Sequence, residues 1–370
     1  MIKKALKGVA DNIFELYGFA RCTVPFILKK PLGYFCDITG RCNLSCEYCW
    51  QRETDNWESE NSKSNKNELT ADQWIDIIKT VPKLSFVAFT GGEPLLFKDF
   101  KNILRFVTNR LPYSVNTNGI LLDEEICNIM ASGKIVNLSV SIDGFADVHD
   151  VTRRRKGLFN TIVDNINLLN SVKKKTRSKN PLLTIKTCIL DRSLDSLVDF
   201  YKFCSETLQA NCLDLRFLRT LDNAQFDLRT YASIDDVNNV GQPSCYHHDR
   251  KEEIPEVLVK ILELSRNKRC KVLIAPKMFK KEEISRFLAV DGKGCYGRCF
   301  LPWSILTILP DGSVIPCLSL NLGNIRDFDY DVKKINNTEK YKEFLRWRTD
   351  MNKKNISPAP CNGCHFLKVV

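Results

Sequence analysis

The sequence predicts an α/β fold with a parallel sheet, followed by a small cysteine-rich domain. Between residues 33 and 218, six short apolar runs with strand character alternate with helical patterns, and this alternation is the signature of a parallel sheet. Several of these runs end directly in polar or glycine-containing motifs. After residue 291 the alternation gives way to a hairpin pattern with cysteines on both sides.

The chain of 370 residues is longer than one average domain, and its hydrophobic content of 44% is sufficient for a buried core. We expect four parts. They are a lead-in, a core domain, a connecting segment that could cover the substrate and a C-terminal domain, with the bounds 1–31, 32–220, 221–291 and 292–370.

The lead-in has apolar residues at helical spacing and lysines at other positions. One interpretation is a basic amphipathic helix that makes a peripheral contact with an anionic membrane. The other is a helix that covers the open end of the core domain, which Asp11 and Glu15 favour because they dilute the positive charge. The apolar positions are Ile2, Leu6, Val9, Ile13 and Leu16, and the lysines are Lys3, Lys4 and Lys7.

The sequence shows no cleavable signal peptide and no apolar run long enough to cross a bilayer, so we expect a cytoplasmic protein. In that reducing compartment, the 16 cysteines are more often metal ligands or catalytic groups than disulfides. The formal net charge of +11 is scattered along the chain. Because no nucleic-acid-binding motif accompanies it, we expect no nucleic-acid partner.

The first strand, residues 33–38, leads into the stretch CDITGRCNLSCEYCW, in which Cys42, Cys46 and Cys49 form a C-x3-C-x2-C motif. This spacing lets one short loop present three thiolates to a cubane cluster. Iron–sulfur clusters normally have four thiolate ligands, so three indicate one iron that is open to another ligand. A zinc loop or a disulfide framework is the alternative, although zinc sites usually bring cysteines in pairs.

The remaining strands are expected at residues 86–89, 113–116, 136–142, 182–189 and 213–218. The polar stretch 51–68 has no periodicity and predicts a loop. Thr70 and Gln73 form a capping box at the start of a helix whose apolar residues are Trp74, Ile77 and Ile78.

Three strand ends carry candidate binding residues. The second strand runs into Gly91, Gly92 and Glu93, where the glycines allow a close approach of backbone and ligand and the carboxylate can accept a hydrogen bond from a cationic amine. The third and fourth strands end in polar turns. Ordinary turn chemistry is the alternative explanation, and the residues in question are Asn118, Ser141 and Asp143.

The segment after the fourth strand contains the motif His149-Asp150-Val151-Thr152-Arg153. A guanidinium is a planar fork of donors that suits a carboxylate, and a solvated basic turn is the alternative. Arg154 and Arg155 follow directly, so the motif does not decide which arginine binds. We expect His149 to order the loop rather than to transfer a proton.

In combination, these motifs resemble those of radical S-adenosylmethionine (SAM) enzymes. The resemblance implies an open, partial (β/α)6 TIM-like barrel with the site at the carboxyl ends of the strands. It also implies a [4Fe–4S] cluster on Cys42, Cys46 and Cys49 whose open iron binds SAM. Reductive cleavage of SAM then gives a 5′-deoxyadenosyl radical that removes a hydrogen atom from the substrate, with flavodoxin or ferredoxin as the electron donor.

The resemblance also assigns the SAM contacts. Tyr48 would stack on the adenine, and the motif at Gly91, Gly92 and Glu93 would bind the amino group. Ser141 and Asp143, with Asn118 as a weaker candidate, would contact the ribose or the carboxylate. Arg153 would lie near the carboxylate. Arg216 and Arg219 are further weak candidates, and no catalytic acid or base is assigned.

The C-terminal part has the pattern C-x12-G-x4-C followed by C-x2-C, around a predicted hairpin of residues 304–309 and 314–317. It resembles the twitch domain, a short relative of the SPASM extension, and this implies one auxiliary [4Fe–4S] cluster. Structural zinc is the alternative, and Cys295 could replace one ligand. The implied ligands are Cys299, Cys317, Cys361 and Cys364.

The segment between the two domains gives little information. Its string CYHHDR, with Cys245, His247 and His248, is interpreted as a surface loop rather than as a metal site, and a helix is expected near residues 257–264.

An auxiliary cluster that is saturated by protein ligands favours oxidation of the substrate radical over simple rearrangement. The spacing of the twitch cysteines is most similar to that of enzymes that dehydrogenate aminocyclitols. The expected substrate is therefore a small sugar-like or aminocyclitol-like molecule. The alternatives are a peptide or protein side chain and a lipid-linked substrate. Leu318 stands where sulfatase-maturing relatives have aspartate, which argues against that activity. A non-catalytic iron–sulfur or zinc protein that carries electrons or acts as a scaffold is an alternative of another class.

Overall fold

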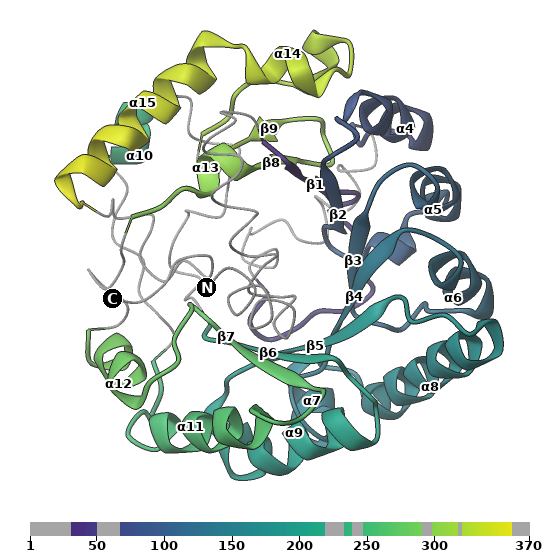
Figure 1. Cartoon of the computed structure of the whole chain (residues 1–370), viewed down its shortest axis with the longest axis vertical. Coiled ribbons are helices and arrows are strands. Elements are labelled where there is room, and N and C mark those ends of the chain that lie inside the picture. The colour runs from purple at the N-terminus through teal and green to yellow at the C-terminus, as the bar shows by residue number, and fades with distance from the viewer. Residues whose placement is uncertain are drawn as a thin grey trace, which may run out of the picture.

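One curved sheet of nine strands organises the chain in the computed structural model, which describes residues 31–49, 67–218, 233–238, 247–290, 298–316 and 320–356 (Figure 1). The strand order is β7-β6-β5-β4-β3-β2-β1-β8-β9. All neighbouring strands are parallel except β8 and β9. The strands are β1 Gly33–Asp37, β2 Phe86–Thr90, β3 Tyr113–Thr117, β4 Ile135–Ser141, β5 Leu182–Cys188, β6 Cys212–Arg216, β7 Lys271–Ala275, β8 Ile305–Ile308 and β9 Val314–Ile315.

Helices connect the parallel strands and lie outside the curve of the sheet (Figure 1). The predicted fold class, an open α/β barrel with an additional C-terminal part, is therefore confirmed. The helices that follow the barrel strands are α4 Ala71–Thr80, α5 Phe100–Thr108, α6 Glu124–Ala131, α7 Ala146–Thr152, α8 Leu158–Thr176, α9 Leu197–Glu206, α11 Ile254–Ser265 and α12 Lys281–Ala289. The other described helices are α10 Ile234–Asn238, α13 Leu301–Ser304, α14 Val332–Asn336 and α15 Glu339–Lys354, and the 3-10 turns are η2 Pro94–Leu96, η3 Asp191–Ser196 and η5 Ile325–Phe328.

The start of α4 has the predicted capping box. The Thr70 hydroxyl accepts a hydrogen bond from the Gln73 N–H at 3.3 Å, and the Gln73 side chain accepts one from the Thr70 N–H at 2.9 Å. Two backbone donors that a helix start leaves unsatisfied are thereby paired. The apolar residues that follow, Trp74, Ile77 and Ile78, are fully buried as the periodicity predicts.

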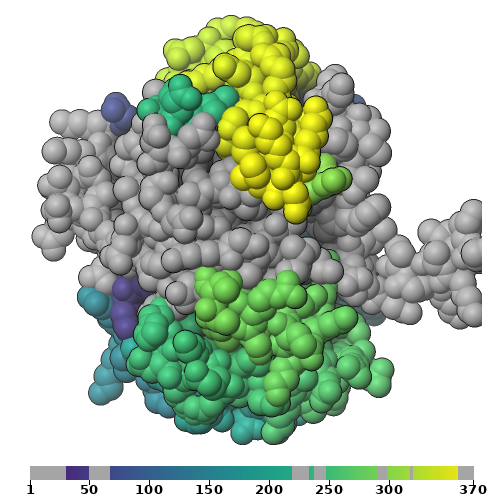
Figure 2. Space-filling model, turned by 90° about the vertical axis from the view of Figure 1, so that its left-hand side faces the viewer, coloured from purple at the N-terminus to yellow at the C-terminus, as the bar shows by residue number. Residues whose placement is uncertain are grey.

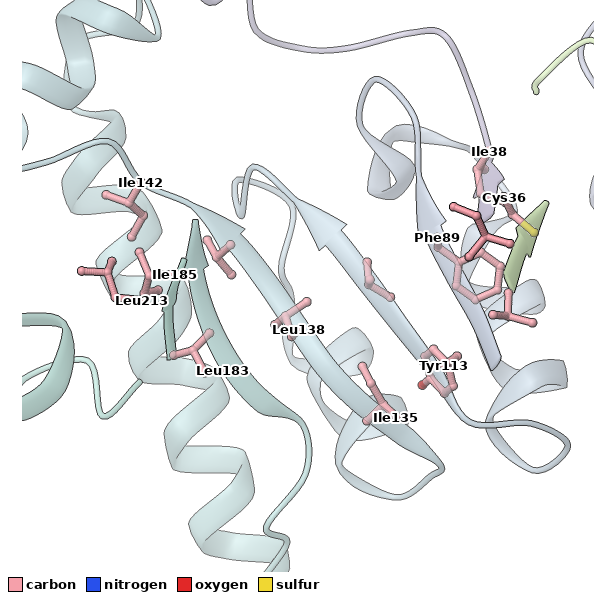
Figure 3. Close-up of a cluster of buried hydrophobic side chains, with 14 of the residues drawn as sticks. Cys36, Ile38, Phe89, Tyr113, Ile135, Leu138, Ile142, Leu183, Ile185 and Leu213 are labelled. Carbon is pink, nitrogen blue, oxygen red and sulfur yellow. The ribbon is translucent and has the colours of Figure 1, made fainter. Parts of the chain in front are cut away.

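The core lies between the sheet and its outer helices (Figure 3). Alternate side chains of each strand point to opposite faces of the sheet, so every second side chain points into this core. Figure 3 shows Leu138, Leu183 and Leu213 from successive strands packed side by side. The side chains on the inner face of the sheet are partly polar. There the Lys186 Nζ of β5 donates to the Asn116 Oδ1 of β3 at 2.6 Å. This hydrogen bond crosses the inner face of β4.

The sheet has three strands more than the six that the sequence predicts for the barrel. β7 belongs to the segment 221–291 and pairs with β6, so this segment adds to the barrel. The hairpin prediction is confirmed, with shorter strands, and β8 also pairs in parallel with β1. Gly33 permits that approach, because an added Cβ would lie 2.9 Å from the Ile305 Cγ2. Gly33 and Ile305 are 272 positions apart in the chain, the difference between 305 and 33, and parallel pairing over that separation has no local sequence signal.

The C-terminal helix α14 packs against α4, and α15 packs against α13 and α14. Figure 2 shows α14 and α15 in yellow, with α11 and α12 in green at the other end of the same face. The Tyr330 hydroxyl accepts a hydrogen bond from the Gln73 side chain at 2.7 Å, and Thr80 bonds the Tyr330 carbonyl at 3.3 Å. None of the helices in the described ranges combines the length and the apolar character needed to span a membrane. Residues 1–30 of the lead-in lie outside the described residues, so both of its interpretations stay predictions.

We predict that Leu138→Ala destabilises the protein by about 2–5 kcal/mol, because Leu138 is fully buried and its removal leaves a cavity. Leu84→Ala is the matched control, because the Leu84 side chain is 90% exposed and its loss should change stability by no more than about 0.5 kcal/mol. Unfolding midpoints in urea measure both variants. Equal midpoints for the two variants would contradict the placement of Leu138 in the core.

Candidate functional site

The cysteine loop leaves β1 at its carboxyl end and carries three thiols, none of which forms a disulfide. Cys46 is buried, and Cys42 and Cys49 are half-buried. The loop closes on itself through a hydrogen bond from the Cys49 N–H to the Cys46 carbonyl at 3.2 Å. Burial raises the pKa of Cys42 to about 12, and nearby acidic groups add to this effect. Cys36 does not belong to this group, because its side chain points into the core (Figure 3).

The loop that follows β2 lies directly against the cysteine loop, backbone to backbone. The Gly92 N–H donates to the Thr39 carbonyl and the Glu93 N–H to the Arg41 carbonyl, both at 2.8 Å. An added Cβ at Gly92 would lie 2.2 Å from the Arg41 carbonyl oxygen, and one at Gly91 would lie 2.5 Å from that of Thr39. Gly91 also has a φ of 125°, which side-chain-bearing residues rarely adopt. The two glycines therefore allow two loops to pack closely.

The Glu93 carboxylate is fully buried and connects this loop to the end of β3. Its oxygens accept hydrogen bonds from the Thr117 hydroxyl at 2.7 Å, the Asn118 N–H at 2.7 Å and the Leu95 N–H at 3.1 Å. Burial raises the pKa of Glu93 to about 7, although these three donors lower it. The carboxylate thus fixes the position of Asn118. Its predicted contact with the amino group of SAM stays a prediction.

Asn118 extends this connection to the first cysteine. Its side-chain Nδ2 lies 2.8 Å from the Asn43 Oδ1 and 4.0 Å from the Cys42 Sγ, and its Oδ1 accepts from the Ile120 N–H at 3.0 Å. The amide is thereby oriented with its donor toward the sulfur.

The end of β4 reaches the second cysteine through a buried ion pair. Asp143 is fully buried, and Arg153 holds both of its oxygens, through Nε at 2.6 Å and Nη2 at 3.2 Å. Burial raises the pKa of Asp143, but the Arg153 guanidinium outweighs this effect and the net shift is downward. The Tyr48 hydroxyl donates to the same carboxylate at 2.7 Å. The Nη1 of Arg153 lies 3.6 Å from the Cys46 Sγ.

His149 supports this ion pair through the backbone of Asp143. The imidazole is fully buried, and its Nδ1 accepts a hydrogen bond from the Asp143 N–H at 3.1 Å. Burial lowers the pKa of His149 to about 4, so the ring is neutral at neutral pH and can keep this acceptor. The contact agrees with the expectation that His149 orders the loop.

The structure brings together most of the residues that the sequence indicates, with some exceptions. Arg154 and Arg155 are exposed, so Arg153 is the arginine of this turn that reaches the site. Ser141 lies on β4 beside Lys186 of β5, and Arg216 pairs with Asp214 at 2.8 Å. Arg219 and Cys245 lie outside the described residues.

His248 differs from the expectation of a surface loop. It is buried, and its Nδ1 lies 3.0 Å from the Asp191 Oδ1. His248 thus lies in a loop, as predicted, but its side chain is not at the surface, because the ring packs edge-on against Phe217 at a centroid distance of 5.8 Å. His247 is exposed.

Sequence reasoning did not identify Glu68 or Asn43. The Glu68 carboxylate accepts from the Thr39 hydroxyl at 2.8 Å and from the Gly40 N–H at 2.9 Å, and so it holds the start of the cysteine loop. Glu68 ends a long polar stretch and has no distinguishing signal. Asn43 directly follows the first cysteine, and that adjacency was a usable signal.

Cys299 belongs to the C-terminal part of the chain. It precedes β8, which begins beside Gly33 at the amino end of β1, whereas the cysteine loop follows the carboxyl end of β1. Asn352 of α15 holds the Cys299 backbone at two points, with Oδ1 accepting from the N–H at 3.0 Å and Nδ2 donating to the carbonyl at 2.7 Å. Cys295, Cys317, Cys361 and Cys364 lie outside the described residues.

The comparisons with known proteins cover both parts. The sequence model described as the radical SAM superfamily matches residues 37–204, and the SPASM model, described as an iron–sulfur cluster-binding domain, matches residues 299–365. The chain belongs to the radical SAM superfamily. The radical SAM domain binds a [4Fe–4S] cluster and SAM, and the SPASM domain binds auxiliary iron–sulfur clusters.

The curated relatives match less than half of this chain. The sporulation killing factor maturation protein SkfB of Bacillus subtilis is 28% identical over 179 residues, which cover 47% of this chain and 40% of that protein. A probable GTP 3′,8-cyclase of Methanosarcina mazei is 29% identical over 47% of this chain and 52% of that protein. The chain thus spans about half the length of these relatives or less.

Solved structures are similar over more of the chain. Streptococcus suis SuiB has a TM-score of 0.59 at 15% identity, and the match covers 90% of this chain and 71% of that one. The enzyme anSMEcpe with bound AdoMet and the Kp18Cys peptide has a TM-score of 0.56 at 19% identity, covering 86% and 83%. These likenesses show the fold.

The donor set of the loop fits a [4Fe–4S] cluster. Three thiols lie on one loop, and side-chain N–H groups of Asn118 and Arg153 point at two of the sulfurs, an arrangement that suits thiolates that ligate a cluster. In the ranges that the structure describes, no three His, Cys, Asp or Glu side chains are placed around a single metal ion. Bound there by Cys42, Cys46 and Cys49, the cluster would supply the electron for reductive cleavage of SAM.

We predict that Gly92→Ala prevents normal formation of the site. The new Cβ would lie 2.2 Å from the Arg41 carbonyl oxygen, so the cysteine loop must move. Iron bound per chain after anaerobic reconstitution should fall by about four. Gly40→Ala is the matched control from the same loop, because its Cβ would meet no atom closer than 3.9 Å. Full iron content in Gly92→Ala would contradict the packing argument.

We also predict that Asn352→Ala reduces the iron content of the C-terminal part alone. Cys299 then loses both side-chain hydrogen bonds to its backbone, while the cysteine loop after β1 is untouched. Iron should fall by up to about four per chain, and SAM cleavage should continue. Asp350→Ala, an exposed change on the same helix, serves as the control. Loss of SAM cleavage together with iron would show that Asn352 is needed for the whole fold.

Proposed function

We propose that this enzyme removes a hydrogen atom from a small polar molecule, such as a sugar-like or aminocyclitol-like compound, and oxidises it by two electrons. The observation that supports a polar substrate is the inner face of the sheet. There the Lys186 ammonium contacts the Asn116 side chain, and Arg216 pairs with Asp214 at 2.8 Å. These charged and amide groups line the face toward which a barrel of this kind directs its chemistry.

The proposed oxidation balances when an electron acceptor is present. Abstraction of a hydrogen atom by the 5′-deoxyadenosyl radical breaks one C–H bond and leaves a substrate radical. Loss of one further electron and one proton from that radical completes the two-electron oxidation. The auxiliary cluster of the SPASM domain would take the electron, and Cys299, Cys317, Cys361 and Cys364 would be its ligands.

A peptide or protein side chain is the second candidate substrate, because the comparisons favour it. Two relatives are named for the maturation of other proteins, SkfB and a cysteine-type anaerobic sulfatase-maturating enzyme of Clostridium novyi. Solved structures of SuiB and anSMEcpe contain bound peptides. A lipid-linked substrate has no specific support.

The proposed reaction needs a low-potential electron donor, for which flavodoxin or ferredoxin is suited. It also needs a reducing compartment, so we place the enzyme in the cytoplasm. For the lead-in we propose a helix that covers the open end of the barrel. Peripheral contact of this helix with a membrane surface is the alternative.

We predict opposite effects for two cysteine variants of the anaerobically reconstituted protein. Cys46→Ala should abolish the release of 5′-deoxyadenosine from SAM with dithionite, because the cluster that binds SAM is lost. Cys317→Ala should retain this release and stop substrate oxidation, because the second electron has no acceptor. Liquid chromatography of 5′-deoxyadenosine and of the substrate measures both.

If Cys317→Ala oxidises its substrate normally, the electron-transfer role of the auxiliary cluster is wrong. If the wild-type protein binds iron but never cleaves SAM, it is an electron carrier or scaffold rather than an enzyme. Incubation with deuterium-labelled aminocyclitols and, in parallel, with deuterium-labelled short peptides then separates the two substrate classes. Deuterium in 5′-deoxyadenosine from peptide samples only would overturn the small-molecule proposal.

A further inference from the structure

Arg153 has three separate contacts, and the SAM-binding role does not account for one of them. Its Nε and Nη2 hold the two oxygens of Asp143, and its Nη1 points at the Cys46 Sγ from 3.6 Å. That distance is within the range of an N–H···S hydrogen bond. The guanidinium therefore donates directly to a sulfur that, on the proposed assignment, ligates the cluster.

The surroundings of Arg153 hold this donor in one orientation. Its side chain is 11% exposed, and that of Asp143 is fully buried. The Tyr48 ring lies against the guanidinium, with 5.4 Å from its centroid to the Arg153 Cζ, and the Tyr48 hydroxyl donates to Asp143 at 2.7 Å. The Cys188 N–H donates to the other oxygen of Asp143 at 3.1 Å. The carboxylate is thus fixed from both sides and holds the guanidinium in turn.

A fixed donor at a cluster-ligating sulfur has a defined electrostatic effect. Reduction adds one negative charge to a cluster and its thiolates, and hydrogen bonds to the sulfurs stabilise that charge, so they raise the reduction potential. The Arg153–Asp143 pair is oriented with its positive end toward Cys46 and its negative end away. Arginine also keeps its charge at every working pH.

We propose that Arg153 is a positioning residue that raises the reduction potential of the SAM-binding cluster by donating a hydrogen bond to the Cys46 thiolate. This inference rests on the proposed ligation by Cys42, Cys46 and Cys49. Asp143 and Tyr48 act through Arg153, because they fix the direction of its Nη1. The role is separate from contact with the SAM carboxylate, and it is present before SAM binds.

The test is a redox titration of the reconstituted protein without SAM, followed by electron paramagnetic resonance of the reduced cluster. Arg153→Gln should shift the potential to a more negative value, so that the ratio of reduced to oxidised cluster at a fixed potential falls about tenfold, equal to about 59 mV for one electron. Arg153→Lys keeps the positive charge but loses the planar guanidinium, so its reduction potential should lie between those of Arg153→Gln and the wild type. Arg155→Gln, an exposed change in the same turn, should leave the potential unchanged.

An unchanged potential in Arg153→Gln samples with full iron content would overturn the inference and leave the proposed function intact. Absence of a redox-active cluster from the wild-type protein would instead overturn the proposed function. A second measurement avoids the risk that the variants fail to fold. In wild-type protein with 15N-labelled arginine, electron–nuclear double resonance of the reduced cluster should detect a nitrogen coupling, and its absence would also overturn the inference.

Discussion

Close backbone packing between two loops is the constraint on which the site depends. The turn after β2 donates its Gly92 and Glu93 N–H groups to the carbonyls of Thr39 and Arg41 in the cysteine loop. Backbones can approach this closely only where no Cβ intervenes, and at Gly92 the space is already filled by the Arg41 carbonyl. The two glycines, Gly91 and Gly92, therefore help to set the position of the loop that carries the three thiols.

From this contact, separate strand ends secure separate sulfurs. Glu93 fixes the end of β3, and through it the Asn118 amide is directed at Cys42. The end of β4 provides Asp143, which directs Arg153 at Cys46. Because parallel strands all end on the same edge of the sheet, a buried carboxylate on each of two loops can position a donor around one cysteine loop. The polar residues of these turns are as much a scaffold for the thiols as candidate contacts to SAM.

The sequence predicted these elements well where the signal is local. The Thr70 capping box, the strands before each motif and the glycines at 91 and 92 all act within a few residues. What it could not predict depends on residues far apart in the chain. The pairing of β8 with β1, the hold of Glu68 on Gly40 and the hold of Asn352 on Cys299 join segments through single polar contacts. No pattern in the sequence distinguishes Glu68 or Asn352 from the many other carboxylate and amide residues of the chain.

The C-terminal part is connected to the barrel in a way that bears on electron transfer. β8 continues the sheet beside β1, and the Leu69 N–H donates to the Pro310 carbonyl at 2.7 Å, next to the residue that holds the cysteine loop. Cys299 lies before the amino end of β8, whereas the cysteine loop follows the carboxyl end of β1. Five residues of strand span about 16 Å, so the chain segment of Cys299 enters this strand pair at one end and the cysteine loop leaves it at the other. If Cys299 binds the proposed auxiliary cluster, this rigid strand pair would connect that cluster to the one proposed on the cysteine loop.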